Sequence, residues 1–286
     1  MYFVSGDRER LDCLRAAQPT LSHADERFML DAPTPAYAPH HSPSAGVNSV
    51  LSGTADHGGR RWTLFFKPLY GVDQPTAHAF GQDSVVDLGL HEVAAWWLAR
   101  ELGPPWSDLV APAVWLDPPG ALDIRASGPV IFGMGGAPGV PEPGVGFDQL
   151  VSDAAFFDAL IGSQDRHDGN LRSSRAPSLG LIDHGFAFAR PGDYHNSYPT
   201  AGFFQRLRFG QRQFALWHGP VLDYSGVGPL SPALAAHEQA ALAKLIGTSG
   251  DLLGIAQLLP DDRAQALRER ARRMHRAQEI LPAADF

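Results

Sequence analysis

Three polar residues follow one another closely in the second half of the chain: Asp165, Asn170 and, after a short apolar segment, Asp183. Phosphoryl transfer from ATP needs a carboxylate that accepts the proton of the attacking hydroxyl, and it needs oxygen ligands for Mg²⁺. Asp165 suits the first task, and Asn170 and Asp183 suit the second. Gly169 allows the tight turn that would bring Asn170 back towards Asp165. The spacing therefore predicts a magnesium-dependent phosphotransferase. The alternative is an ordinary turn, because Asp, Gly and Asn are common loop residues.

Two predicted elements flank this motif and would position it. Apolar residues recur at helical spacing over residues 147–161, which lead directly into Asp165. Residues 179–182 are typical of a short strand that presents Asp183, and Gly185 frees the turn that follows. The motif flanked by an apolar helix and an apolar strand with a second aspartate indicates a phosphotransferase more specifically than the motif alone.

A lysine and a glutamate upstream could complete such a site. Lys67 ends an apolar strand predicted over residues 62–67, and Glu92 lies on the first turn of a helix predicted over residues 90–102. A lysine there is costly to bury unless it is paired. Glu92 could supply that pair while the ammonium contacts the α- and β-phosphates of a nucleotide. The alternative is a solvated lysine and an unrelated glutamate favoured by the helix dipole.

The remaining signals divide the chain into three regions. Residues 1–45 contain one possible helix and then four prolines, which indicate an appendage or linker. Residues 46–136 are rich in predicted strands, and residues 137–286 are mainly helical. This order is typical of an α+β, bilobal protein-kinase-like fold with a strand-rich N-lobe and a helical C-lobe. The other predicted elements are a helix over 8–17, a hairpin of strands 47–54 and 62–67, strands over 109–116 and 129–134, and helices over 231–246, 251–259 and 262–281.

The motif resembles that of a known superfamily. DRHDGN at 165–170 followed by LIDHG is similar to the DRHxxN and DxG signatures of the phosphatidylinositol 3- and 4-kinase-like superfamily. Its relatives include atypical protein kinases and, more distantly, HipA-type toxin kinases. The resemblance covers residues 46–190. Ordinary protein kinases place a histidine before the aspartate, whereas here Gln164 precedes it and His167 follows it.

The resemblance implies a role for each motif residue. Asp165 would be the catalytic aspartate, and His167 would assist at the γ-phosphate or the acceptor. Asn170 and Asp183 would bind Mg²⁺. Arg166 would pack or pair structurally.

The resemblance also implies that ATP lies between the lobes, with Lys67 and Glu92 as the pair that orients its phosphates. No GxGxxG motif precedes Lys67, and the corresponding segment 42–49 would offer hydroxyls and backbone amides instead. The adenine is expected against the strand and connection at 129–136. The candidate nucleotide contacts are Ser44 and Asn48 in the loop, and Ile131 and Met134 in the strand and connection.

These features predict an ATP- and Mg²⁺-dependent kinase that acts on a hydroxyl of a protein or small-molecule acceptor. Three alternatives remain: a phosphatidylinositol-type lipid kinase, an AMP transferase on the same fold, and a non-catalytic nucleotide-binding scaffold. An anionic acceptor could be bound by arginines after Asp183, although solvated surface positions explain them equally well. These residues are Arg190, Arg206, Arg208 and Arg212.

Composition limits the other possibilities. A formal net charge of −8 disfavours nucleic acid and anionic lipid, and Cys13 is the single cysteine, so an intrachain disulfide is impossible. We expect a cytoplasmic, soluble protein without a signal peptide or transmembrane segment. The twelve histidines show no HExxH spacing, which disfavours a metallohydrolase. The basic helix at 262–281 could contact a membrane or partner, but a packed helix with a basic outer face is the preferred interpretation.

Overall fold

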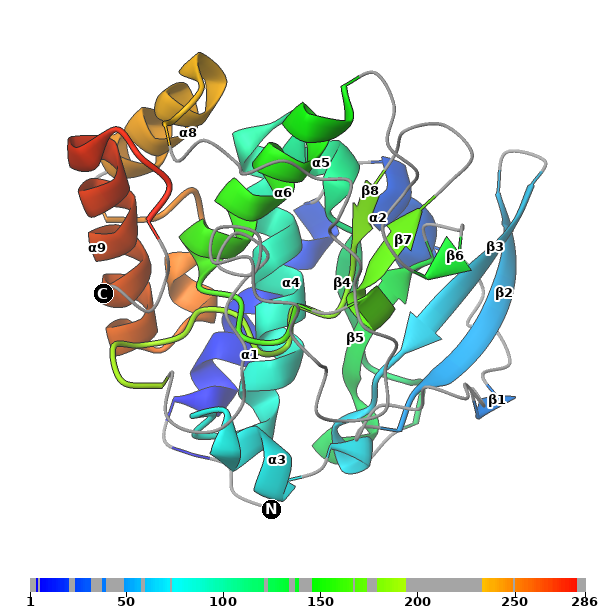
Figure 1. The fold of residues 1–286 in the computed structure, drawn as a ribbon. Helices are drawn as coiled ribbons and strands as arrows, with labels where there is room; N and C mark the ends of the chain where they lie inside the picture. The colour runs from blue at the N-terminus through cyan, green and yellow to red at the C-terminus, as the bar shows by residue number, and fades with distance from the viewer. Residues whose placement is uncertain are drawn as a thin grey trace.

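The computed structural model combines helices with antiparallel strands (Figure 1). The residues that it describes are 4, 6–20, 24–31, 38–39, 49–57, 60–72, 74–120, 123–133, 137–138, 146–166, 168–173, 179–193, 233–248 and 250–281. Among these, none of the helices combines the length and apolar character that crossing a bilayer requires.

A five-stranded sheet forms one side of the described structure. Its strands, in spatial order, are β1 (Ala38–Pro39), β2 (Leu51–His57), β3 (Arg60–Phe66), β5 (Gly128–Phe132) and β4 (Ala113–Leu116), with every neighbouring pair antiparallel. The ladder between β2 and β3 runs from Leu51 opposite Phe66 to His57 opposite Arg60, which confirms the predicted hairpin. Leu64 and Phe66 point into a small apolar cluster, because alternate side chains of a strand share one face.

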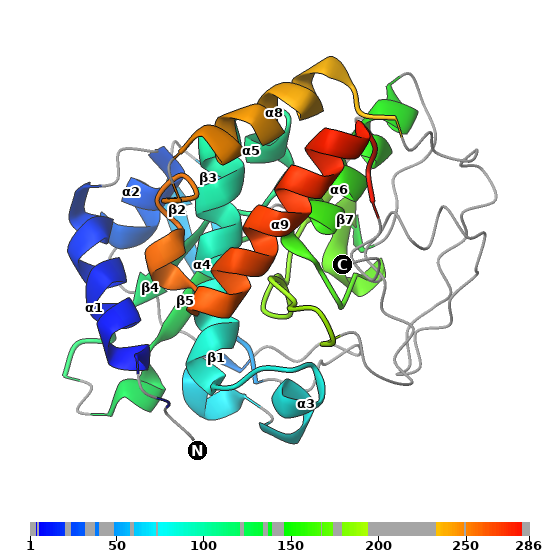
Figure 2. The same cartoon turned by 90° about the vertical axis from the view of Figure 1, so that its left-hand side faces the viewer.

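Helix α4 (Val85–Leu102) packs against strands β4 and β5 of this sheet (Figures 1 and 2). The helix begins five residues before its predicted start, where the Ser84 hydroxyl and the Asp87 carboxylate form a capping box. Every residue from Val85 to Ala99 is buried. A Cβ atom on Gly89 would lie 2.7 Å from the Trp115 ring, so glycine allows α4 to approach strand β4 closely.

The second part of the chain forms three longer helices and a small sheet. Its elements are α6 (Phe147–Ile161), α8 (Ala236–Gly247), α9 (Asp261–Ala277) and the antiparallel strands β6 (Ala137–Pro138), β7 (Leu171–Ser173) and β8 (Leu179–Leu181). Two short helices lie earlier in the chain, α3 (Gln74–Ala79) and α5 (Trp106–Leu109). One apolar cluster joins α4, α6, α8 and α9, so α4 contributes to the core that the later helices share.

Several predicted boundaries in this part are wrong. Helix α8 begins at Ala236 rather than at 231, and α9 ends at Ala277 rather than at 281. Residues 251–259 form turns and the single 3₁₀ turn η5 (Ala256–Leu258) instead of an α-helix. The predicted strand at 109–116 is shorter, because only Ala113–Leu116 pairs with β5.

The first helices of the chain pack on the core. Helix α1 (Asp7–Ala17) confirms the predicted helix, whereas α2 (Ala24–Asp31) was not expected. Arg10 of α1 donates to the Asp87 carboxylate at 2.8 Å, and Glu26 of α2 accepts from Trp96 at 2.7 Å. Both helices lie within residues 1–45, the region predicted to be an appendage or linker, and both make hydrogen bonds to α4.

Candidate functional site

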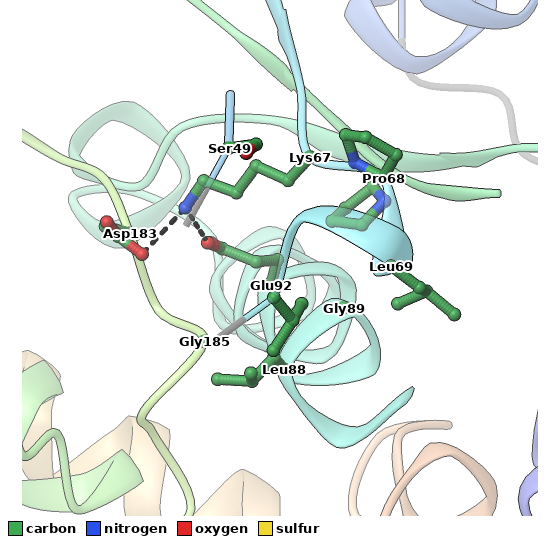
Figure 3. Close-up of a pocket in the computed structure, with 11 residues that line it drawn as sticks. Ser49, Lys67, Pro68, Leu69, Leu88, Gly89, Glu92, Asp183 and Gly185 are labelled. Atoms are coloured by element: carbon green, nitrogen blue, oxygen red, sulfur yellow. Dashed lines mark hydrogen bonds and ion pairs between the residues drawn. The ribbon is translucent and has the colours of Figure 1, made fainter. Parts of the chain in front are cut away.

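Two carboxylates from distant segments of the chain meet the ammonium group of Lys67. Its Nζ atom lies 2.6 Å from Oε1 of Glu92 on α4 and 2.7 Å from Oδ1 of Asp183 after β8 (Figure 3). Lys67 follows strand β3, and its backbone N–H donates to the Pro129 carbonyl at 3.0 Å. A Cβ atom on Gly128 would lie 2.1 Å from the Lys67 carbonyl oxygen, so a side chain there would displace the segment that carries the lysine.

Glu92 contacts Lys67 with one carboxylate oxygen and the segment that follows β8 with the other. While Oε1 faces Lys67, Oε2 accepts from the backbone N–H of His184 at 2.8 Å. Burial alone would raise the pKa of Glu92, but the Lys67 charge and the hydrogen bonding from His184 outweigh burial and lower it. For Lys67 the directions are reversed. Burial alone would lower the pKa of its ammonium group, but the charges of Asp183 and Glu92 outweigh burial and raise it. Both groups are therefore charged at neutral pH.

Asp183 has an unusual backbone conformation. Its φ is 61°, in the left-handed region that non-glycine residues adopt rarely and at a cost of roughly 1 kcal/mol or more. The following segment is held against α4, where His91 Nδ1 donates to the Gly185 carbonyl at 3.0 Å. A Cβ atom on Gly185 would lie 3.2 Å from Leu88, so glycine at this position allows the segment to approach α4 closely. The residue with the strained backbone is therefore the one whose carboxylate contacts Lys67.

Asn170 folds back onto Asp165, as the spacing predicts. Its Nδ2 atom donates to the Asp165 carbonyl at 2.8 Å and lies 3.5 Å from the Asp165 carboxylate. Because this nitrogen is used, the amide oxygen is the atom that Asn170 can offer to a cation. The Asp183 side chain is 35% exposed and has a second carboxylate oxygen besides the one that faces Lys67. Amide and carboxylate oxygens are hard donors that suit Mg²⁺, so the residues present fit that ion.

Arg166 holds the two parts of this site together. It is fully buried and forms a bidentate ion pair with Asp158 of α6 at 2.9 and 3.0 Å. Its Nη1 also donates to the carbonyls of Asn170 at 2.8 Å and Ile182 at 2.7 Å. This confirms the expected structural role of Arg166. Asp158 was missed, although an aspartate within an apolar helix is a signal that it has a buried partner.

Helix α9 fastens the segment that follows Asp183. Arg263 donates to the Phe188 carbonyl at 2.9 Å, and Arg270 donates to the carbonyls of Leu160 at 2.9 Å and Ala189 at 2.5 Å. Both arginines are buried. They face inwards, so the expectation of a basic outer face on this helix is wrong for these two arginines.

A pocket adjoins the Lys67 ion pairs (Figure 3). Its described lining consists of Ser49, Lys67, Pro68, Leu69, Val72, Leu88, Gly89, Glu92, Pro129, Asp183 and Gly185. Ile131 is not part of this lining: it is 4% exposed, and its strand position pairs with Phe65 and Ala113. Ser44, Asn48, Met134 and His167 lie outside the described residues.

Arg190 is occupied by an ion-pair network. It contacts the carboxylates of Asp83 at 2.7 Å, Asp193 at 3.2 Å and Asp262 at 3.0 Å. This arginine therefore holds neighbouring segments together. Residues 206, 208 and 212 lie outside the described ranges.

No family model matches the chain, and no curated protein matches it significantly in sequence.

Proposed function

We propose that the protein is an ATP- and Mg²⁺-dependent phosphotransferase with a bilobal, kinase-like arrangement, which transfers the γ-phosphate to a hydroxyl of a protein or a small molecule. The observation that carries this proposal is the meeting of Glu92 and Asp183 at the Lys67 ammonium. Protein kinases use a strand lysine paired with a helix glutamate to bind phosphates, and an aspartate after a later strand to bind Mg²⁺. Here the same residue types come from a strand end, a helix and a segment after a strand.

Each residue has a task that follows from its position. Lys67 orients the phosphates, and Glu92 keeps the ammonium in place. Asp183 and Asn170 would ligate Mg²⁺, which when bound with ATP offsets the charge of the phosphates. Asp165 lies beside Asn170 and would accept the proton of the attacking hydroxyl. The five-stranded sheet with α4 would form the nucleotide lobe, and α6, α8 and α9 would belong to the catalytic lobe.

A protein or small-molecule hydroxyl is favoured over an inositol lipid as the acceptor. The chain carries a formal net charge of −8, which opposes approach to an anionic membrane. Within the described residues, Arg190 is already engaged by three carboxylates, so it is a poor candidate for a lipid headgroup.

Nucleotide binding tests the proposal first. Thermal unfolding of the wild type should shift upwards with ATP and Mg²⁺ together, and less with either alone. Asp183→Asn should reduce the Mg²⁺-dependent part of the shift, because it removes the anionic ligand. Asp56→Asn is the matched control, since this carboxylate is 71% exposed on the β2 to β3 hairpin. A wild type that shows no Mg²⁺-dependent stabilisation by ATP would contradict the proposal.

Labelled nucleotides then separate the alternatives. Incorporation of label from γ-labelled ATP supports phosphoryl transfer, whereas label from α-labelled ATP would identify an AMP transferase. Binding without incorporation, across protein extracts and a panel of small alcohols, would indicate a scaffold. Incorporation only into phosphoinositide vesicles would identify a lipid kinase.

A further inference from the structure

A second cluster of polar side chains joins α6 to α8, apart from the Lys67 site. Asp153 lies on α6, and His237 and Glu238 lie on the first turn of α8. One nitrogen or oxygen atom from each residue lies within 4.8 Å of the other two. The His237 Nε2 atom is 2.7 Å from Asp153 Oδ1. In Figures 1 and 2, α8 lies at the same end of the molecule as α5, which supplies the neighbouring Trp106.

Both carboxylates of this cluster are buried. Asp153 is 4% exposed, and Glu238 is fully buried. Two buried anions this close together are unfavourable unless a proton or a cation offsets their charge.

Glu238 also has one buried oxygen without a hydrogen-bond partner among the described residues. Its Oε2 atom accepts from the Ala235 backbone N–H at 2.7 Å, which explains half of the carboxylate as a helix cap. Within the described residues, the buried Oε1 atom has no hydrogen-bond partner. A buried acceptor in this state costs about 1–3 kcal/mol, and more if it is charged. The cap alone therefore does not account for the whole side chain.

From this geometry we propose that Asp153, His237 and Glu238 bind a divalent transition-metal ion of the Zn²⁺ class. An imidazole nitrogen with two carboxylate oxygens suits such an ion, whereas Mg²⁺ prefers oxygen ligands alone. Tetrahedral bonds of about 2.0–2.2 Å place the ligand atoms of one zinc ion roughly 3.4 Å apart. His237 Nε2 and Asp153 Oδ1, which are 2.7 Å apart, would therefore separate slightly, and ligand atoms that lie up to 4.8 Å apart would approach one another. The ion would take the place of the hydrogen bond between His237 Nε2 and Asp153 Oδ1.

The surroundings already orient these ligands. Gln149, one helical turn before Asp153, donates to its Oδ1 atom at 2.8 Å, and Trp106 donates to the Asp153 carbonyl at 3.2 Å. The ring of Trp106 lies 5.5 Å from that of His237, centroid to centroid. Outer contacts of this kind fix the orientation of metal ligands. A bound ion would clamp α8 onto α6, the helix that leads into Asp165.

Zinc titration of the full chain tests this site. The protein is freed of metal with a chelator and titrated with ZnCl₂ by calorimetry, and bound zinc is counted by mass spectrometry after desalting. We expect one equivalent in the wild type and at least a tenfold weaker affinity in His237→Gln. His275→Gln on α9 is the matched control and should bind as the wild type does. Because His237 is 38% exposed, its replacement should leave the fold intact, which circular dichroism verifies.

Glu238→Gln separates a metal ligand from a simple helix cap. Without zinc, this variant should be at least as stable as the wild type, because it removes a buried charge and can keep the bond to Ala235. With zinc, only the wild type should gain melting temperature, so the order of stability reverses. Absence of stoichiometric binding, or zinc binding that neither His237→Gln nor Glu238→Gln weakens, would overturn the proposal. Neither result depends on ATP or on transferase activity.

Discussion

Replacing Glu92 with glutamine removes one charge from the Lys67 site and keeps the shape of the side chain. The glutamine oxygen can accept from Lys67 or from the His184 backbone N–H, but not from both through separate oxygens. Its amide nitrogen must then face another donor. A charge-assisted bond contributes about 1.5–3 kcal/mol, and a buried unsatisfied donor costs about 1–3 kcal/mol. Lys67 keeps Asp183 and is 17% exposed, so both terms are reduced.

We therefore expect Glu92→Gln to destabilise the protein by about 2 kcal/mol, which corresponds to a melting temperature lower by about 4 °C for a chain of this size. Glu101→Gln on the same helix is the control. Its partner Arg100 is retained and its own side chain is 41% exposed, so its effect should stay below about 0.5 kcal/mol. Urea unfolding at pH 7 measures both.

The pH dependence gives a second, independent check. The pKa of Glu92 is lowered in the folded state, so its contribution is fully present above the unfolded pKa of about 4.3 and is lost as pH falls towards the lower folded value. The difference in stability between wild type and Glu92→Gln should be constant from pH 7 to about pH 5.5 and should shrink below about pH 4.3. Equal stability at pH 7, or a difference that grows on acidification, would refute the reasoning.

Three further predictions concern helix packing, a buried ion pair and the proposed catalytic base. Gly89→Ala should lower stability by about 1–2 kcal/mol, because its Cβ atom would lie 2.7 Å from the Trp115 ring. Gly247→Ala has open space around it and should be neutral or stabilising, and urea unfolding measures the sign of both changes. Arg166→Lys should cost roughly 3–5 kcal/mol in urea unfolding, because lysine cannot reproduce the bidentate pair with Asp158, and stability near that of the wild type would contradict the structural role. Asp165→Asn should reduce transfer of γ-label about 100-fold or more and leave the thermal shift by ATP and Mg²⁺ in place; unchanged transfer would remove Asp165 from the proposed mechanism.

Local patterns predicted several elements of the fold. The apolar repeat predicted α6 with the bounds that it has. The β2 to β3 hairpin was also predicted, but β2 spans Leu51–His57 rather than 47–54 and β3 spans Arg60–Phe66 rather than 62–67. The pairing of Lys67 with Glu92 was also predictable, because a lysine at the end of an apolar strand needs a partner.

Other features depend on tertiary contacts that no local pattern contains. The first turn of α4 is buried on all sides, so it shows no amphipathic period, and its capping box at Ser84 was overlooked. Residues 251–259 carry apolar side chains that suit a helix, but Leu252 and Leu253 adopt positive φ angles that end any helical turn. The cluster of Asp153, His237 and Glu238 joins two helices that are far apart in sequence.

The arginines of α9 bear on where a minimal functional fragment can end. The motif resemblance alone would place its limit near residue 190, just after the segment that follows Asp183. Yet the carbonyls of Phe188, Ala189 and Leu160 accept their hydrogen bonds from Arg263 and Arg270, more than seventy positions further on. A fragment that stopped at residue 190 would leave these three buried acceptors without their donors. A fragment that keeps these hydrogen bonds therefore has to extend through α9.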